Sequence, residues 1–118
     1  MTPESSSTTP AWFDISTPDS LRAKAFYQAL LGWQVNALDE TYALVGTPEQ
    51  PDGGIGQAGD ASPYVGIVVY FPVENVDVAV ERAVGLGAKQ VLGPLDTPMS
   101  RIAVVEDLDG NRVGLISR

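Results

Sequence analysis

Residues 101–117, Arg101-Ile-Ala-Val-Val-Glu-Asp-Leu-Asp-Gly-Asn-Arg-Val-Gly-Leu-Ile-Ser117, predict a β-hairpin. Ile102 to Val105 and Val113 to Ile116 are apolar runs rich in β-branched residues, and Asp107 to Asn111 supply an acidic turn that contains a glycine. A two-stranded hairpin alone is only marginally stable in water. These strands therefore complete a larger sheet that the rest of the chain contributes.

The composition excludes several kinds of chemistry. The 118 residues contain no Cys and no His, which removes disulfides, thiolate nucleophiles, thiolate metal sites and the commonest general base. The formal charge of -8, with seven Lys and Arg residues scattered along the chain, argues against a nucleic-acid partner. The sequence has neither a membrane-length apolar run nor the basic and apolar parts of a signal peptide. We therefore expect one soluble, cytoplasmic domain that binds neither nucleic acid nor membrane.

The first half of the chain predicts a strand, a helix and three further strands. Residues 1–10 have no apolar periodicity and are expected to form a flexible tail. The expected helix follows a strand at 11–17, with Thr17 as its N-cap and Gly32 as its C-cap. One apolar face at helical spacing is expected to pack on the sheet: Ala23, Phe26, Tyr27 and Leu30. Strands are then expected at 33–37, 41–45 and 53–57.

The second half repeats this order. A nearly continuous apolar strand at 65–73 precedes a helix that Asn75 caps and Gly87 ends, and a further strand leads into the hairpin. The same β-α-β-β-β order recurs at an offset of about 55 residues, which predicts two duplicated modules, 11–60 and 64–118. The alternative is an ordinary α+β domain whose halves share this order by coincidence.

Two such modules predict an α+β fold, in which a curved eight-stranded mixed sheet has its helices outside and a cupped ligand cavity inside. Because side chains alternate along a strand, each strand divides its residues between these two faces. On the helix side we expect Phe13, Ile15, Val69, Phe71, Val73, Val113 and Leu115. On the cup side we expect Trp12, Asp14, Val68, Tyr70, Arg112, Gly114 and Ile116. A register slip of one residue would exchange the two faces.

Several segments follow one another in a specific order: 12–27, Leu31-Gly-Trp33, Gly53-Gly-Ile-Gly56, Val69-Tyr-Phe-Pro-Val73, Asn75-Val-Asp77, Leu86-Gly-Ala88 and 101–115. In this order they resemble the vicinal oxygen chelate superfamily. The nearest likeness is its glyoxalase/bleomycin resistance protein/dioxygenase branch, among small bacterial proteins related to lactoylglutathione lyase. The resemblance covers nearly everything after residue 10. It implies paired β-α-β-β-β modules, commonly in a homodimer, and, in the enzymes, four cup-facing His, Glu or similar ligands for a divalent metal.

The chain departs from this superfamily at the metal-ligand positions. The resemblance places Trp12, Val68 and Gly114 at three of them, and Gly54 or Gly56 at the fourth. None of these side chains can ligate a metal ion. We therefore expect no metal, no cofactor and none of the superfamily's metal-dependent lyase or dioxygenase chemistry.

Asp14 is the strongest candidate for a functional side chain. In the cup beside Trp12, its carboxylate would lose water and its pKa would rise. It would then act as a base or bind an amine or hydroxyl group of a ligand. The alternative is a structural ion pair with Arg101 or Arg112. An aromatic wall against a planar ligand, or simple packing between strands, is expected from Trp12, Tyr42 and Tyr70.

Three other motifs have simpler explanations. Arg101 and Arg112 are candidates for clamping an anion, but solvated charges at the rim explain them as well. Gly53 to Gly56 lack the Lys-Ser/Thr continuation of a phosphate-binding loop, and backbone crowding at the module junction explains them. Asp107 to Asn111 lack the distal Glu of a calcium loop, so turn formation is sufficient.

The sequence thus predicts a metal-free protein that holds a small organic molecule in the cup, in a sequestration or resistance role. The candidate ligand-binding residues are Trp12, Asp14, Tyr42, Val68, Tyr70, Arg101, Arg112 and Gly114. One alternative is a glyoxalase-like lyase or isomerase, or a hydrolase, with Asp14 as its catalytic base. A second alternative is a non-catalytic dimeric scaffold.

Overall fold

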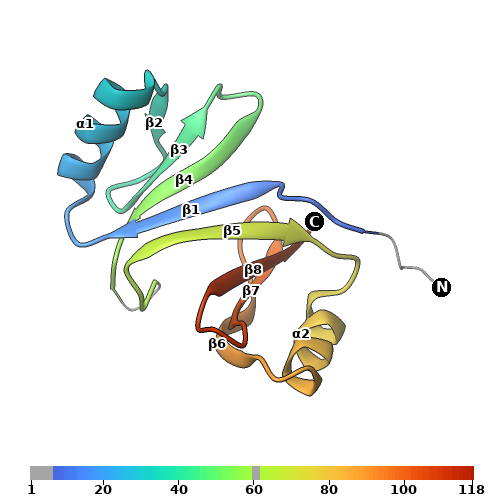
Figure 1. Ribbon diagram of the computed structural model, residues 1–118. Coiled ribbons are helices and arrows are strands. Elements are labelled where there is room, and N and C mark those ends of the chain that lie inside the picture. The colour runs from blue at the N-terminus through green and yellow to red at the C-terminus, as the bar shows by residue number, and fades with distance from the viewer. Residues whose placement is uncertain (1–6, 60–61) are drawn as a thin grey trace. The chain divides into compact units, whose positions relative to one another are not determined.

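The computed structural model describes residues 7–59 and 62–118 (Figure 1), so the first six residues of the predicted tail lie outside the described part. In chain order its elements are β1 (Trp12–Thr17), α1 (Ser20–Leu31), β2 (Val35–Ala37), β3 (Tyr42–Gly46), β4 (Pro51–Gln57), β5 (Gly66–Pro72), α2 (Val76–Gly85), β6 (Lys89–Asp96), β7 (Arg101–Glu106) and β8 (Arg112–Ser117). The order β-α-β-β-β occurs twice, as the sequence predicts. Neither helix, of 12 and 10 residues, has the length and apolarity needed to cross a membrane.

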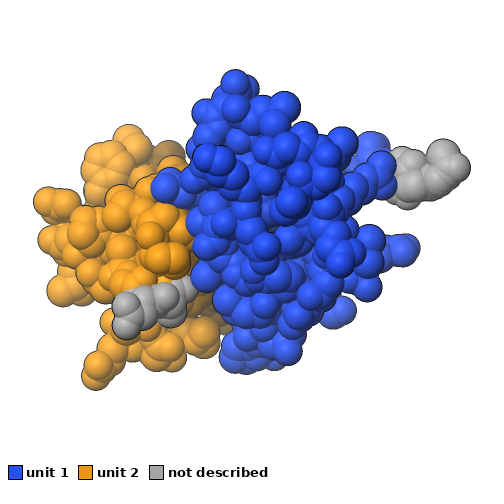
Figure 2. All heavy atoms as spheres, turned by 90° about the horizontal axis from the view of Figure 1, so that it is seen from below, with its two compact units in different colours: residues 1–11, 69–118 blue, residues 12–68 orange. Residues whose placement is uncertain are grey.

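The chain divides into two compact units, which Figure 2 colours separately. One is 12–68, and the other is 69–118 together with the segment up to Ala11, so the boundary falls within β5. The strand order is β2-β3-β4-β1 in the first module and β5-β8-β7-β6 in the second. β1 pairs parallel with β4, and β5 pairs parallel with β8. The other neighbouring strands, β2-β3-β4 and β8-β7-β6, pair antiparallel. This mixed pairing of eight strands, with one helix in each module, confirms the α+β class and the two βαβββ modules. A cup shared by both modules stays a prediction.

The unit 12–68 has a core between its strands and α1. Buried Ile15, Val45 and Ile55 pack there with a set of partly buried side chains, namely Phe13, Ala23, Tyr27, Trp33 and Val35. The rings of Tyr27 and Trp33 stack with their centroids 5.0 Å apart. Because Phe13 and Ile15 face the helix, as predicted, the alternation of β1 places Trp12 and Asp14 on its other face.

The start of α1 differs from the prediction. Its N-cap is Asp19, whose carboxylate accepts the N–H of Arg22 at 3.1 Å. Thr17, the predicted cap, lies earlier and accepts the N–H of Asp19 instead. The difference follows from β4, where the Gln57 amide accepts the N–H of Ser20 and donates to the carbonyl of Pro18.

The predicted apolar face of α1 is only partly correct. Ala23 and Tyr27 pack on the core, but Phe26 and Leu30 are 56% and 62% exposed. At 3.6 residues per turn, Phe26 lies about 80° and Leu30 about 40° around the helix from the middle of the packed pair, both on the same side of it. The end of the helix agrees with the prediction, because Gly32 caps it in the left-handed conformation.

The other unit has the corresponding core between its strands and α2. Buried Val76, Val80, Ala103 and Val105 pack there with partly buried side chains that include Val73, Val113 and Leu115, three residues predicted to face the helix. Val69, also predicted to face the helix, is 36% exposed. Asn75 is the N-cap of α2, as predicted, and accepts the N–H of Val78 at 3.0 Å.

The hairpin turn agrees with the sequence. The Asp107 carboxylate accepts the N–H groups of Asp109 and Asn111 at 2.9 and 2.8 Å, and Gly110 has φ +87°, which favours glycine. Turn formation therefore accounts for this acidic segment. The strand predicted to lead into the hairpin is β6, which continues through Pro94 to Asp96.

Candidate functional site

The candidate site lies in the unit 12–68, on the face of the strands that α1 does not cover. The strand register places Asp14 of β1 beside Gly54 of β4, and Tyr42 of β3 beside Gly56 of β4. The Tyr42 ring lies across both glycines. A Cβ on Gly54 would lie 1.8 Å from Tyr42 Oη, and a Cβ on Gly56 would lie 3.0 Å from its Cδ1. The two glycines therefore provide the space through which Tyr42 reaches Asp14.

Three side chains meet at this point and form what we name the Asp14 cluster: Trp12, Asp14 and Tyr42. The Tyr42 hydroxyl donates to Asp14 Oδ1 at 2.5 Å. Trp12 forms side-chain hydrogen bonds with both Asp14 and Tyr42, and its indole N–H is only a donor. The cluster thus joins a carboxylate from β1 to two aromatic side chains, one of them 28 residues away in sequence.

Burial decides the protonation of this cluster. It raises the pKa of Asp14 from 3.8 to about 6, although the hydrogen bonds from Tyr42 and Trp12 act in the opposite direction. Burial, together with the negative charge of Asp14, raises the pKa of Tyr42 well above its ordinary value. At neutral pH the cluster is therefore an ionised carboxylate beside a neutral phenol. A carboxylate has about four acceptor directions, so Tyr42 and Trp12 leave part of it available.

Sequence reasoning missed three neighbours of the cluster: Ser16, Ser62 and Tyr64. The Ser62 hydroxyl donates to Ser16 Oγ at 2.8 Å, and Ser16 shares the face of Asp14 because it follows by two residues in β1. Tyr64 is 7% exposed and contributes a little to the raised pKa of Tyr42. Strand alternation alone would have found Ser16, whereas Tyr64 lies outside the strands and gives no such signal.

An open hollow of about 340 Å³ adjoins these neighbours. It is lined by Ala58, Gly59, Ser62, Pro63, Tyr64 and Val65. Asp14 does not line it. The Ser62–Ser16 hydrogen bond joins the lining of this hollow to β1, on the face that bears Asp14.

The other predicted aromatic, Tyr70, is placed by a glycine in the same way. It lies in β5 opposite Gly114 of β8, and a Cβ on Gly114 would lie 2.4 Å from the Tyr70 ring. Tyr70 belongs to the unit 69–118 and is 1% exposed. Val68, in the unit 12–68, is fully buried.

The two predicted arginines lie on the hairpin in the unit 69–118. Arg101 donates to both carboxylate oxygens of Asp77, at 2.8 and 3.0 Å, and to Asp96 at 2.9 Å. The ion pair that the sequence left open between Arg101 and Asp14 is thus formed with these two residues instead. Arg112 stands opposite Glu106 in the hairpin register.

The glycine run in β4 has a different cause from the one predicted. A Cβ on Gly53 would lie 2.6 Å from the Phe13 ring on the helix side, while Tyr42 covers Gly54 and Gly56 on the other side. Two aromatic rings of the same unit therefore require these glycines. The prediction that crowding at the module junction explains them was wrong.

The residues at the superfamily's metal-ligand positions do not fit a metal ion. Trp12 and Val68 have no donor atom for a cation, and Gly54, Gly56 and Gly114 have no side chain and lie under tyrosine rings. Within residues 7–59 and 62–118, no three His, Cys, Asp or Glu side chains gather to hold a metal ion.

Comparison with known proteins identifies the family. Residues 11–116 match the family described as a glyoxalase-like domain. The anthracycline biosynthesis protein DauV of Streptomyces sp. (strain C5) is 30% identical over an alignment of 105 positions, which covers 84% of this chain and 38% of that protein. The anthracycline biosynthesis protein DnrV of Streptomyces peucetius is 26% identical over an alignment of 121 positions including gaps, which covers 86% of this chain and 44% of that protein. The chain thus spans about two fifths of the length of these curated relatives.

A solved structure shows the same fold. It is a glyoxalase/bleomycin resistance protein/dioxygenase superfamily member from Vibrio splendidus 12B01, with a TM-score of 0.63 and 13% identity. The match covers 95% of this chain and 100% of that one. The chain therefore belongs to the glyoxalase-like domain family, within the vicinal oxygen chelate superfamily.

Proposed function

We propose that this protein binds a small organic molecule at the Asp14 cluster without the help of a metal ion. The observation that carries the proposal is the position of Asp14, a half-buried carboxylate on the sheet face opposite α1. Trp12 and Tyr42 hydrogen-bond to it, so the polar group is placed among aromatic side chains. A few oriented polar groups among apolar walls are the usual composition of a small-molecule site.

The relatives support an aromatic ligand. DauV and DnrV are both named as anthracycline biosynthesis proteins, and anthracyclines contain planar fused rings. Planar rings bind well against Trp and Tyr side chains, which supply large apolar area at little cost in conformational entropy. We therefore propose a fused-ring aromatic as the ligand, held for sequestration or for a biosynthetic step.

Titration with a fluorescent anthracycline tests this proposal. We expect saturable binding that is unchanged by EDTA, and a Kd that rises roughly 10-fold or more in Trp12→Ala, because aromatic anchors dominate binding energy. Met99→Ala, which removes a 58% exposed apolar side chain in the other unit, serves as the control and is expected to bind normally.

Loss of binding in EDTA, or unchanged binding by Trp12→Ala, contradicts the proposal. If thermal shift across a panel of metabolites and antibiotics also finds no ligand, the scaffold alternative is favoured.

A second candidate function is base catalysis by Asp14. It is favoured by the pKa of about 6, which lies close to the pH at which a general base works best. In this case Asp14→Asn abolishes turnover of a neutral ligand, while its binding mostly survives. A variant that binds and turns over such a ligand like the wild type excludes this function.

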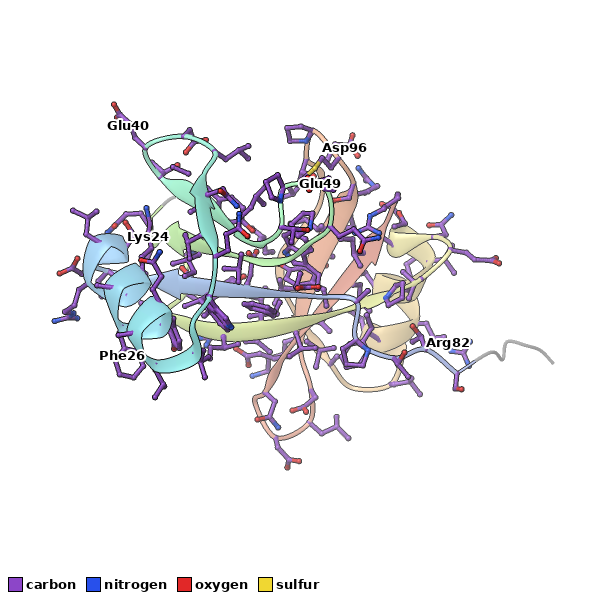
Figure 3. The ribbon with its side chains drawn as sticks, turned by 90° about the horizontal axis from the view of Figure 1, so that it is seen from above. Lys24, Phe26, Glu40, Glu49, Arg82 and Asp96 are labelled. Carbon is purple, nitrogen blue, oxygen red and sulfur yellow. The ribbon has the colours of Figure 1, made fainter. Side chains whose placement is uncertain are left out.

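We further propose that the protein is a homodimer that covers the exposed apolar side chains of α1. Leu21, Phe26, Leu30 and Leu31 are more than half exposed, and Figure 3 shows Phe26 on the outer side of the helix. The relatives are more than twice as long as this chain, which leaves room in one polypeptide for a second unit of this kind.

Light scattering after size exclusion measures the association. We expect a dimer for the wild type and a monomer for Phe26→Lys, because a charge placed in an apolar contact is left without water. Val84→Lys on α2, at a side chain that is 47% exposed, is the matched control and stays dimeric. A monomeric wild type refutes the dimer, and a dimeric Phe26→Lys variant excludes this surface.

A further inference from the structure

We infer that the ligand carries a protonated amine, which Asp14 binds as its counter-ion. This inference rests on the proposed function and names the chemical class of the ligand. It starts from the fact that the groups shown bonding to Asp14 are neutral donors, the Tyr42 phenol and the Trp12 indole. A half-buried carboxylate with only neutral partners keeps its charge uncompensated, which is costly in the folded protein.

The unit around Asp14 offers no cation of its own on that face. Residues 12–68 contain seven Asp and Glu residues but only two cations, Arg22 and Lys24. Both cations lie on α1, which packs on the face of the strands that bears Ile15. Arg22 is 77% exposed and pairs with Asp19, and Figure 3 shows Lys24 on the same helix. No cation of residues 12–68 therefore lies on the face of Asp14, and the groups that act on the pKa of its carboxyl carry no positive charge. On these grounds the counter-charge is assigned to the ligand.

The hydrogen-bonding pattern also favours a cationic donor. The Tyr42 hydroxyl proton already points to Asp14, so the outward-facing capacity of the pair consists of acceptor lone pairs on Asp14 and on Tyr42 Oη. An ammonium group donates up to three hydrogen bonds and has no acceptor. The rings of Trp12 and Tyr42 add cation–π attraction at close range. An anionic ligand would meet only repulsion and unpaired acceptors at the same place.

The aromatic part of such a ligand has space beside the cluster. Tyr64 and Ser62 line part of the hollow of about 340 Å³, and the Ser62 hydroxyl donates to Ser16, which lies on the face of Asp14. An amine seated on Asp14 therefore leaves its attached ring to extend along the side of the cluster. The inferred class is an aromatic amine cation.

Three probes that share one ring system separate the amine from the ring: 2-naphthylmethylamine, 2-naphthalenemethanol and 2-naphthoate. Binding to the full chain at pH 7.5 is followed by NMR through the Trp12 indole N–H, which reports directly on the cluster. We expect the amine to bind roughly 10-fold or more tightly than the alcohol, because hydrogen bonds to charged groups are the stronger ones, and the carboxylate to bind least.

Two variants that each remove one negative charge test whether Asp14 is the carboxylate that binds the amine. Asp14→Asn is expected to remove the preference for the amine, so that the amine and the alcohol bind the variant about equally. Glu40→Gln removes one exposed carboxylate from the same unit and is expected to keep the preference for the amine, which excludes an effect of net charge alone.

Each other outcome contradicts the inference in a distinct way. Equal binding of amine and alcohol, or a preference that survives Asp14→Asn, overturns the amine assignment but leaves aromatic binding at the cluster intact. If none of the three probes shifts the Trp12 indole signal, both the amine assignment and binding at this cluster are overturned.

Discussion

Replacing Gly54 with alanine is expected to destabilise the protein by about 2–5 kcal/mol, the combined cost of an overpacked site and a broken buried hydrogen bond. The reason is geometric, because the new Cβ would lie 1.8 Å from Tyr42 Oη and 2.1 Å from its Cζ. The Tyr42 ring would have to leave the sheet surface, and Asp14 would lose the phenol that donates to it. Urea denaturation at pH 7.5 measures the effect as a lower midpoint.

Two further variants test whether the loss of stability comes from the clash with Tyr42. Gly85→Ala, near the end of α2, places its Cβ where nothing lies within 4 Å, and is expected to be neutral or up to about 1 kcal/mol stabilising. Adding Tyr42→Ala to Gly54→Ala removes the clash, so the double variant should lose less than the sum of the two single losses. Additive losses would show that the two residues do not compete for one space.

Asp14→Asn is expected to change the pH dependence of stability. The Asp14 carboxyl has a pKa of about 6 in the folded protein and an ordinary value of 3.8. Between these values the folded state holds a proton that the unfolded state has released, so the free energy of unfolding falls as pH rises from about 4 to about 6. A shift of this size corresponds to a loss of at most about 3 kcal/mol, which is fully present above pH 6. Asparagine cannot ionise, so the variant should lack this slope and should be more stable than the wild type at pH 8.

Unfolding by urea between pH 4 and pH 8 compares the two proteins, with Glu40→Gln as a variant of equal charge change. Asp77 and Asp107 have pKa values lowered by hydrogen bonds, chiefly from Arg101 and from the Asn111 backbone. These two carboxylates stabilise the folded state above about pH 4, and this stabilisation is lost as the pH falls below that value. Their effect is therefore separate from that of Asp14, which acts between pH 4 and pH 6. Parallel curves for wild type and Asp14→Asn from pH 4 to pH 6 would contradict the assignment.

The parts of the fold that were predictable depend on local periodicity. Strand alternation is rigid, so the division of Phe13 and Ile15 from Trp12 and Asp14 followed from sequence alone. The helix caps at Gly32 and Asn75 were also predictable, because each depends on the backbone preference or side chain of a single residue.

The parts that were not predictable depend on contacts between distant residues. Thr17 and Asp19 are both good N-caps, and the choice between them involves Gln57, 37 residues beyond Ser20. The partnership of Tyr42 with Asp14 left no periodic signal, although the glycines opposite Tyr42 were visible in the sequence. The partners of Arg101 come from α2 and the end of β6, and no short motif connects them.

The tyrosine rings above Gly54 and Gly114 have an evolutionary consequence. A mutation that placed glutamate at either glycine would collide with the ring before it gained any ability to bind a cation. A cation-binding glutamate at either position therefore needs the tyrosine above it to be replaced first. In a chain that carries these tyrosines, a return to metal binding at Gly54 or Gly114 therefore needs at least two substitutions for each position.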